Sequence, residues 1–375
     1  MTRTPRARAA RGASRVGERF EVEVGPIAHG GHCVARIADE GSRVVFVRHA
    51  LPGERVVVEI TEGTEGDRFW RADAVEVRAP STDRLAAPCP YAGPGRCGGC
   101  DFQHVSLERQ RRLKADVVRE QLARLAGLDV GVEVEAVPGD QDGLRWRTRQ
   151  RYVPLPGGAR GMRKHRSHDV VEVDECLLEA PSPVVEEVAQ QPSRNHTVGA
   201  LSFEVAEDGF WQVHPGAPAV LVETVLDLLA PRQGESALDL YAGVGLFARF
   251  LLDAVGEAGR VVAVEADPGA AANAAANCPG AEVRAGAVQR VLATAYDEPF
   301  DLVVLDPPRV GAKRRVVTQV ADRRPRAVAY VACDPAALAR DVAIFAEHGY
   351  RLVALRAFDL FPMTHHVECV ALLAP

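Results

Sequence analysis

The sequence lacks an apolar run long enough to cross a bilayer, and its N-terminus lacks the apolar stretch of a secretory signal peptide. It also lacks the small, evenly spaced cysteine framework of a disulfide-stapled secreted domain, because its eight cysteines are spread through 375 residues with several in one cluster. These absences indicate metal-binding or catalytic thiols in a reducing compartment. We therefore expect a cytoplasmic monomer without membrane association.

Acidic residues are absent from two stretches, although the net charge of −6 gives no general hint of nucleic acid. The first fifteen residues carry five arginines, which predicts a basic, flexible tail over residues 1–15. Residues 145–166 carry eight lysine and arginine side chains. In LRWRTRQRYV a period of two would place Arg145, Arg147, Arg149 and Arg151 on one face of a strand. This pattern favours contact with RNA phosphates, the alternative being an exposed strand whose arginines are merely solvated.

A chain of 375 residues is too long for a single ordinary core and predicts two or three domains. Short alternating runs broken by Gly and Pro over residues 16–79 are typical of a small antiparallel β-barrel. Residues 80–199 are mixed, with a cysteine-rich loop, an amphipathic helix near 107–125 and the basic strand. From residue 200 to 375, strands alternate with helices, as in a doubly wound α/β sheet. The last region is the catalytic candidate.

A strand of this last region ends in a glycine turn, Gly243-Val244-Gly245. Glycines allow the backbone to approach a ligand at the carboxyl edge of a sheet. The next strand ends in Glu265, an acid placed to bind the hydroxyls of a ribose, and the two features together predict a nucleoside cofactor. The alternative for Glu265 is a cap on the following helix. The absence of a full GxGxxG run argues against a nicotinamide dehydrogenase.

Two later strands end in residues that suggest chemistry. Asp306 precedes two prolines at the carboxyl end of one strand, and Cys333 follows the strand beside it. A cysteine after an apolar strand is usually inert core, but the acids around Cys333 favour a nucleophile, with Glu368 as a distant carboxylate.

The segments FWQVHPGAP, DLYAGVG, DPPR, ACDPAALARD and FPMTHHVECVALL resemble the S-adenosylmethionine-dependent RNA 5-methyluridine methyltransferases of the ribosomal and transfer RNA branches. The resemblance spans nearly the whole chain. It implies a Rossmann-like class I methyltransferase domain, an N-terminal OB-like TRAM barrel, a small mixed central domain and an RNA substrate, more often ribosomal. By the same resemblance, Cys333 is the nucleophile that adds to uracil C6 and Glu368 is the base that removes the C5 proton. The resemblance assigns S-adenosylmethionine to Gln212, Tyr241, Glu265 and Asp306.

The cysteine cluster, read from its spacing, is moderately specific for a metal. Cys97 and Cys100 form a CxxC pair, but a zinc ribbon would need a second pair. By the family resemblance, Cys89, Cys97, Cys100 and Cys176 are ligands of an iron-sulfur cluster of the 4Fe-4S type.

Three positions depart from the family pattern. Leu246 stands where the family has Asn after the glycine turn, Ala287 stands where an acid or amide meets the adenine, and Asp334 replaces Asn beside the nucleophile. Two alternative functions remain open, the first from the DPPR motif and the second from the barrel, the basic strand and the thinner cofactor contacts. One is an amino-group methyltransferase, and the other is a catalytically silent RNA-binding assembly factor.

Overall fold

The computed structural model describes residues 12–140, 142–181 and 193–375. The chain forms two compact units, each assembled from separate segments. The first contains Met1–Leu113, Arg151–Leu177 and Pro362–His365, and the second contains Lys114–Gln150, Leu178–Phe361 and His366–Pro375. The segment predicted as a central domain, 80–199, therefore divides between the two units.

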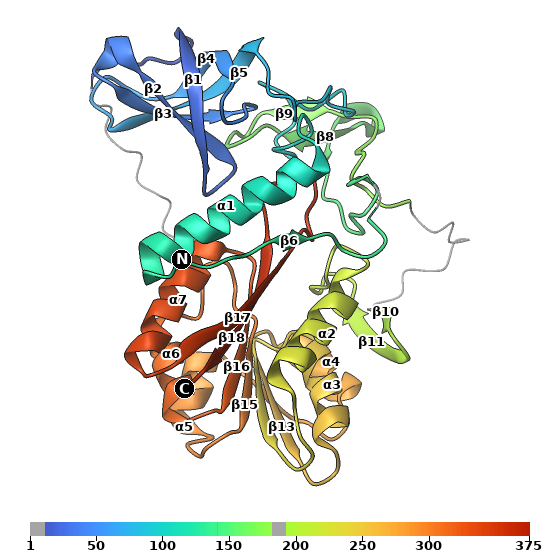
Figure 1. Ribbon diagram of the computed structural model, residues 1–375. Coiled ribbons are helices and arrows are strands. Elements are labelled where there is room, and N and C mark those ends of the chain that lie inside the picture. Colours follow the sequence, from blue (N-terminus) through green and yellow to red (C-terminus); the bar gives the residue numbers. More distant parts are fainter. Residues whose placement is uncertain (1–11, 141, 182–192) are drawn as a thin grey trace. The chain divides into compact units, whose positions relative to one another are not determined.

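The first unit begins with the predicted β-barrel (Figure 1). Its strands are β1 (Arg19–Ala28), β2 (His32–Ile37), β3 (Arg43–Arg48), β4 (Arg55–Glu62) and β5 (Phe69–Ala79), with a 3-10 turn at Ala38–Glu40. They close in the order β1-β2-β3-β5-β4, with only β3 and β5 parallel. The alternating pattern of β4 buries Val56, Val58 and Ile60, as expected for a half-buried strand.

The predicted N-terminal tail falls only partly within the described chain, because residues 1–11 lie outside it. Arg15, at the end of that prediction, is bound to the barrel. Its guanidinium pairs with Glu18 at 3.1 Å and with Glu40, and it lies 5.2 Å from the ring centroid of Trp70.

The rest of the first unit is a cysteine-rich loop and a small sheet. The sheet contains β7 (Val153–Pro154), β8 (Arg160–Arg163) and β9 (Val170–Glu172), with a 3-10 turn at Pro156–Gly158. Helix α1 (Leu107–Ala126) confirms the amphipathic helix predicted near 107–125. It starts in the first unit and continues into the second.

The strand predicted from the alternating arginines is wrong, because residues 145–152 form an irregular loop. Arg145 has a positive φ of 57°, which interrupts an extended backbone. Thr148 donates from its backbone N–H and from its hydroxyl to the carbonyl of Val213, at 2.9 and 3.0 Å. Arg149 donates from Nη1 to the carbonyl of Gly209 at 2.6 Å. Arg147 forms an isolated parallel bridge with Glu179, but residues 145–152 join no sheet, so the arginines do not line one face of a strand.

The second unit is built on an eight-stranded sheet (Figure 1). Its order is β14-β13-β12-β15-β16-β18-β17-β6, with β12 to β16 parallel and β18 antiparallel to both neighbours. The strands are β6 (Val134–Glu135), β12 (Ser236–Leu240), β13 (Arg260–Glu265), β14 (Glu282–Ala285), β15 (Leu302–Leu305), β16 (Ala327–Ala332), β17 (Arg351–Phe358) and β18 (Glu368–Ala374). A separate hairpin pairs β10 (Ser193–Val198) with β11 (Leu201–Ala206). The parallel strands alternate with helices, which confirms the predicted α/β fold.

Helices cover both faces of this sheet (Figure 1). They are α2 (Ala217–Leu229), α3 (Leu246–Val255), α4 (Pro268–Asn277), α5 (Val288–Thr294), α6 (Lys313–Asp322) and α7 (Pro335–Glu347). One core joins the sheet to the C-terminal half of α1 and to α5, α6 and α7, and the other joins it to α2 and α3. Leu238 and Leu240 point into the first core and Ala237 into the second, so the strands are buried on both faces.

No helix in the described part of the chain is long and apolar enough to span a bilayer.

Candidate active site

The site lies at the carboxyl edge of the sheet, where the strand order reverses around β12. Leu240 pairs with Val264 on one side and with Leu305 on the other. The residues that follow these three, Tyr241, Glu265 and Asp306, therefore emerge side by side. Ligands of doubly wound sheets bind at this switch point.

The glycine turn after β12 is held open by Glu265. Gly243 has φ 55° and donates its N–H to Glu265 Oε2 at 2.9 Å. A Cβ added at Gly243 would meet no atom within 4 Å, so there is free space beside this backbone. Tyr241 also has a positive φ, 66°, which is strained for a residue with a side chain. The alternative role of Glu265 as a helix cap is taken by Asp267, which accepts from the N–H of Ala270 at 2.8 Å and caps α4.

Buried acids gather around this turn. Burial raises the pKa of Asp239 to about 7, and the charges of Asp306 and Glu265 add to the rise. Burial and Glu265 likewise raise the pKa of Asp306 to about 7. Neighbouring carboxyl groups disfavour each other's ionisation, and a cation bound between them would favour the ionised forms. The turn, its open space and these acids fit a positively charged nucleoside such as S-adenosylmethionine.

Cys333 and Glu368 meet across two antiparallel strands. Ala332 at the end of β16 pairs with Cys369 in β18, so the next residue, Cys333, lies opposite Glu368. Cys333 is half-buried, while Glu368 is only 5% exposed. The two groups also interact electrostatically, since the charge of Glu368 is second only to burial in raising the pKa of Cys333 to about 12.

Arg309 is the positively charged residue that acts on both Cys333 and Glu368. Burial and the charge of Asp306 raise the pKa of Glu368, and Arg309 opposes that rise. Arg309 also opposes the rise in the pKa of Cys333. Its Nη2 lies 3.1 Å from Nε2 of His366, just before β18. The arrangement places one thiol, one carboxyl group and one guanidinium near the carboxyl end of β16.

Asp334, the departure beside the nucleophile, caps α7. Its Oδ1 accepts from the N–H of Ala337 at 2.8 Å. Asn and Asp are about equally good at this position of a helix, so the exchange keeps the cap. The carboxylate also helps to raise the pKa of Cys333, but less than burial, Glu368 and Asp306 do.

The sequence reasoning missed Asp341, a buried residue of α7. It accepts from the N–H of Ala312 at 2.7 Å, from the N–H of Lys313 at 3.2 Å and from the hydroxyl of Tyr330 at 2.6 Å. These bonds fix the loop that follows Asp306. The available signal was an acid within the apolar face of a helix, in the segment AALARDVAIF. Asp239, a buried acid inside an apolar strand, carried a similar signal.

The remaining predicted cofactor positions are less engaged. Gln212 lies in the loop between β11 and α2, and within the described chain no hydrogen bond joins its side chain to Glu265 or Asp306. Leu246 starts α3 and is buried in the core. Ala287 precedes α5 and offers no side-chain cap.

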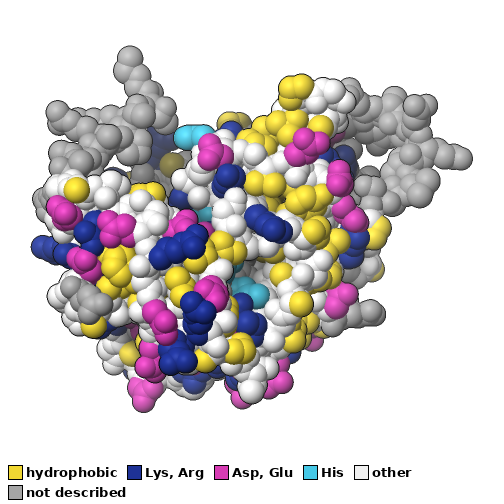
Figure 2. Space-filling model, turned by 90° about the horizontal axis from the view of Figure 1, so that it is seen from above, with side chains coloured by type: hydrophobic (Ala, Val, Ile, Leu, Met, Phe, Trp, Pro, Cys, Tyr) yellow, Lys and Arg dark blue, Asp and Glu magenta, His cyan; other side chains and the backbone are white. Residues whose placement is uncertain are grey.

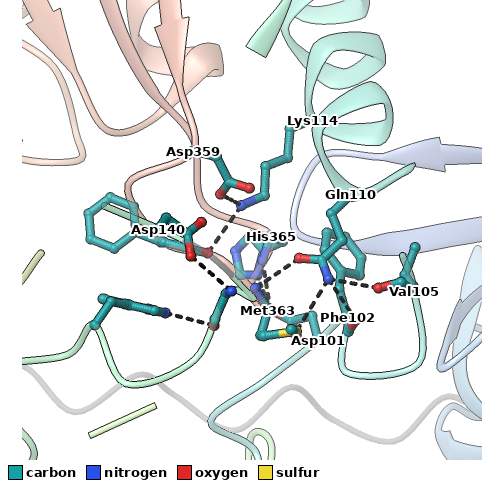
Figure 3. A network of polar contacts seen from close by, with 12 residues as sticks. Asp101, Phe102, Val105, Gln110, Lys114, Asp140, Asp359, Met363 and His365 are labelled. Atoms are coloured by element: carbon teal, nitrogen blue, oxygen red, sulfur yellow. Dashed lines mark hydrogen bonds and ion pairs between the residues drawn. The ribbon is translucent and has the colours of Figure 1, made fainter. Parts of the chain in front are cut away.

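Two polar networks anchor the segment before Glu368, one in each unit (Figure 3). In the second unit, Lys114 pairs with Asp359, both almost fully buried, and donates to the carbonyl of Phe361 at 3.1 Å. In the first unit, His365 Nδ1 lies 2.6 Å from Asp101 Oδ2. This contact fixes the imidazole of His365 within the first unit.

The four predicted cluster ligands lie within electrostatic reach of one another in the first unit. Burial raises the pKa values of Cys89, Cys97 and Cys100, and the charge of Cys176 adds to each rise. Cys97 Sγ accepts from the N–H of Gly99 at 3.4 Å. The donor set suits iron and sulfide. However, no three His, Cys, Asp or Glu side chains in the described residues are arranged to hold a metal ion.

Comparisons with known proteins cover both units. Residues 13–75 match the TRAM domain, and residues 287–375 match the tRNA (uracil-5-)-methyltransferase family. An uncharacterized RNA methyltransferase of Streptomyces avermitilis is 44% identical, over 96% of this chain and 99% of its own. The 23S rRNA (uracil(1939)-C(5))-methyltransferase RlmD of Chromohalobacter salexigens is 32% identical, over 92% and 87%.

Among solved structures, the chain resembles the tRNA (uracil-54, C5)-methyltransferase of Pyrococcus abyssi in complex with S-adenosyl-L-homocysteine. The TM-score is 0.68 at 20% identity, covering 94% of this chain and 99% of that one. At this identity the likeness shows a shared fold.

Proposed function

This chain belongs to the RNA (uracil-5-)-methyltransferase family, and from that premise we propose that it methylates C5 of a uridine in 23S ribosomal RNA, with S-adenosylmethionine as the donor. The observation that carries the proposal is the opposition of Cys333 and Glu368 across β16 and β18. A thiol and a carboxyl group in this arrangement suit two steps of one reaction: the thiol adds to a ring, and the carboxylate later removes a proton from that ring.

The residues act in sequence. Uracil C5 is too weakly nucleophilic to take a methyl group directly, so the thiolate of Cys333 forms a bond to C6 and the electrons of the C5–C6 double bond move toward C5. S-Adenosylmethionine, when bound, supplies the methyl group. Glu368 then takes the proton from C5, the double bond forms again, and the bond between Sγ and C6 breaks to release the thiolate.

The thiolate must be generated against a high pKa. Arg309 is the group that stabilises it, since its charge opposes those of Glu368 and Asp306 at the thiol. A base inside folded RNA must also leave its stack to reach this edge of the sheet, so flipping of the uridine is part of the proposal.

We propose that Tyr241, Glu265 and Asp306 would hold the cofactor, together with Gln212 from the loop before α2. Glu265 suits the ribose hydroxyls, and the buried acids suit the positive sulfonium. The space beside Gly243 allows the nucleoside to approach the backbone.

Ribosomal RNA is the preferred substrate because two relatives with 32% identity, from Chromohalobacter salexigens and Alkalilimnicola ehrlichii, are named as 23S rRNA enzymes. The transfer RNA enzyme shares the fold at lower identity.

The direct test is nucleoside mass spectrometry of unmodified 23S rRNA and tRNA transcripts after incubation with S-adenosylmethionine. We expect 5-methyluridine in 23S rRNA with the wild type and none with Cys333→Ala. Cys369→Ala is the matched control, since Cys369 is a buried neighbour that faces the opposite side of the sheet. Methylation by Cys333→Ala would refute the mechanism, and methylation of tRNA alone would refute the substrate.

We further propose that Cys89, Cys97, Cys100 and Cys176 hold an iron-sulfur cluster. Support comes from four thiols in one neighbourhood and from N–H donors to two of the sulfurs, from Gly99 to Cys97 and from Gln103 to Cys100. Anaerobic purification should give absorbance near 400 nm with iron and sulfide in equal amounts, lost in Cys176→Ser. Absence of iron in the anaerobic wild type would refute the cluster.

A further inference from the structure

Arg309 is exposed, and among the described residues its guanidinium hydrogen-bonds only to His366. Nη2 of Arg309 lies 3.1 Å from Nε2 of the imidazole. Within the same residues no carboxylate forms an ion pair with this guanidinium, and the charge of Glu368 acts on it from farther away. An exposed arginine side chain has many rotamers, so the bond to His366 is what fixes the guanidinium in place.

This bond determines the protonation state of His366. A guanidinium has N–H donors and no acceptor, so Nε2 of His366 accepts from Arg309 and carries no proton. The imidazole is therefore neutral, with its proton on Nδ1. A doubly protonated ring would lose the acceptor and would place two positive groups in contact.

A neutral partner leaves the charge of Arg309 available to other groups. Two other arginines of the second unit are paired with carboxylates instead, Arg314 with Glu347 at 2.8 Å and Arg356 with Glu135 at 2.8 Å. Positive and negative side chains are also interspersed on the molecular face in Figure 2. A carboxylate beside a guanidinium cancels most of its field at a third group, whereas a neutral imidazole does not.

The charge of Arg309 reaches both groups of the proposed mechanism. It opposes the rise in the pKa of Cys333 and the rise in the pKa of Glu368. Coulomb energy falls with distance, and water and salt screen it further, so a guanidinium that turned toward solvent would lose this effect. The direction in which Arg309 points therefore influences how readily the thiol ionises.

Aromatic packing holds the ring of His366. The ring meets Phe361 edge to face, with centroids 5.8 Å apart and planes at 80°. Phe361 meets Trp146 in the same way, at 6.1 Å and 77°. Trp146 is only 4% exposed, and its Nε1 donates to the carbonyl of Gly143 at 3.1 Å. Edge-to-face contacts favour one ring orientation, so a buried support presents Nε2 to Arg309.

We propose that His366 is a positioning residue: its neutral imidazole accepts from Arg309 and keeps the guanidinium directed at Cys333, where the positive charge favours the thiolate. His366 itself exchanges no proton with the substrate. The contribution of His366 to methylation rests on the proposed function, whereas its effect on the thiol is a property of the free protein.

Two amide side chains of different length test the acceptor. In His366→Gln, Oε1 takes the place of Nε2 and can accept from Arg309, whereas in His366→Asn the oxygen is one methylene too short. Alkylation of Cys333 by iodoacetamide at pH 8, without RNA or cofactor, reports the thiolate. We expect His366→Asn to slow alkylation by about threefold to tenfold, and His366→Gln to stay within about twofold of the wild type.

A double variant links the effect to the guanidinium. Because His366 acts through Arg309, adding His366→Asn to Arg309→Ala should slow alkylation no further than Arg309→Ala alone. His348→Asn is the control and should react as the wild type, since the ring of His348 contacts the hydroxyl of Thr318 at 3.1 Å instead. If His366→Asn unfolds at a lower temperature than the wild type, His366→Leu provides a second variant without an acceptor, and it should also react slowly.

The outcomes separate this inference from the proposed function. Wild-type alkylation in His366→Asn, or equal slowing in His366→Asn and His366→Gln, would overturn the positioning role. Additive losses in the double variant would overturn it too, since His366 would then act on the thiol without Arg309. Wild-type protein that leaves every uridine unmethylated, while the variants alkylate as expected, would defeat the proposed function alone.

Discussion

At the scale of single residues, the proposed nucleophile Cys333 has a raised pKa in the free protein. Burial and the charge of Glu368 raise its pKa to about 12, so the thiol predominates at neutral pH. The same carboxyl group is the proposed base for the later step. The proposed nucleophile and the proposed base would therefore repel each other when both are ionised, with Arg309 as the compensating charge.

This coupling predicts the reactivity of Glu368→Gln. Removing the carboxylate should lower the pKa of Cys333 and speed its alkylation by iodoacetamide at pH 8, by about tenfold for each pKa unit. Arg309→Ala should slow alkylation, since it removes the charge that favours the thiolate. Mass spectrometry of the Cys333 peptide over time measures both rates. Equal rates in all three proteins would show that the charges do not reach the thiol.

Asp306 predicts the pH dependence of cofactor binding. Its pKa of about 7 means that the carboxyl group is largely protonated at pH 6 and ionised at pH 8. A sulfonium cation favours the ionised form, so affinity for S-adenosylmethionine should rise with pH, by up to about tenfold per unit for each proton released.

Calorimetry at pH 6, 7 and 8 measures this linkage. S-Adenosylhomocysteine, which has no positive sulfur, should show a weaker dependence, and Asp306→Asn should flatten the curve for S-adenosylmethionine. Identical pH profiles for the two ligands would contradict the role of the acids.

At the scale of elements, the proposed catalytic pair, Cys333 and Glu368, depends on the register of the sheet. The end of β16 and the start of β18 are opposed only because β18 runs antiparallel between β16 and β17. The loop that carries Asp306 and Arg309 is fixed in turn by Asp341 of α7.

Asp341→Ala should loosen that loop. Two backbone N–H groups and the hydroxyl of Tyr330 would lose their buried acceptor, at a cost of about 3 kcal/mol in the free energy of unfolding. Displacement of Arg309 should lower kcat by roughly tenfold to a hundredfold. Tyr330→Phe removes one of these bonds and should cost only about 1 kcal/mol. Urea unfolding and single-turnover assays test this, and wild-type values for Asp341→Ala would contradict it.

Local pattern was enough for the elements with strong periodicity. The barrel strands, α1 and the alternating strands and helices of the second unit follow from hydrophobic spacing and turn residues. Residues 145–152 also alternate, but Thr148 and Arg149 bond to a distant loop, and no local pattern reports that. Local strand propensity is overridden where the segment forms its hydrogen bonds with a distant part of the chain.

The site was predictable in part for the same reason. Asp306 and Cys333 follow neighbouring parallel strands, so their closeness follows from the order of the strands. Glu368 could be named from the sequence only as a distant carboxylate, because the pairing of β18 with β16 that brings it to Cys333 is non-local.

At the scale of the whole molecule, a chain with net charge −6 must bind RNA through local groups. The arginines of residues 145–151 now divide into two kinds. The guanidinium of Arg149 donates to the carbonyls of Gly209 and Asp208, at 2.6 and 3.3 Å, whereas Arg151 is exposed.

These two arginines should therefore differ in the salt dependence of RNA binding. Arg151→Ala should reduce the slope of log affinity against log salt by about 0.7 to 0.9, as for one lost phosphate contact. Arg149→Ala should leave the slope unchanged and lower stability by about 1 kcal/mol. Filter binding from 50 to 300 mM salt, with thermal unfolding as the companion measurement, distinguishes them. An unchanged slope in Arg151→Ala would remove this segment from the RNA interface.

The central claim is that Cys333 forms a covalent bond to C6 of the target uridine. RNA containing 5-fluorouridine tests it most directly, because fluorine at C5 cannot leave as a proton and the adduct persists. With S-adenosylmethionine present, the wild type and Cys369→Ala should each form a denaturation-resistant complex with the RNA, mapped by mass spectrometry to Cys333. Cys333→Ala should form none. An adduct on another residue, or a persistent complex with Cys333→Ala, would contradict the account.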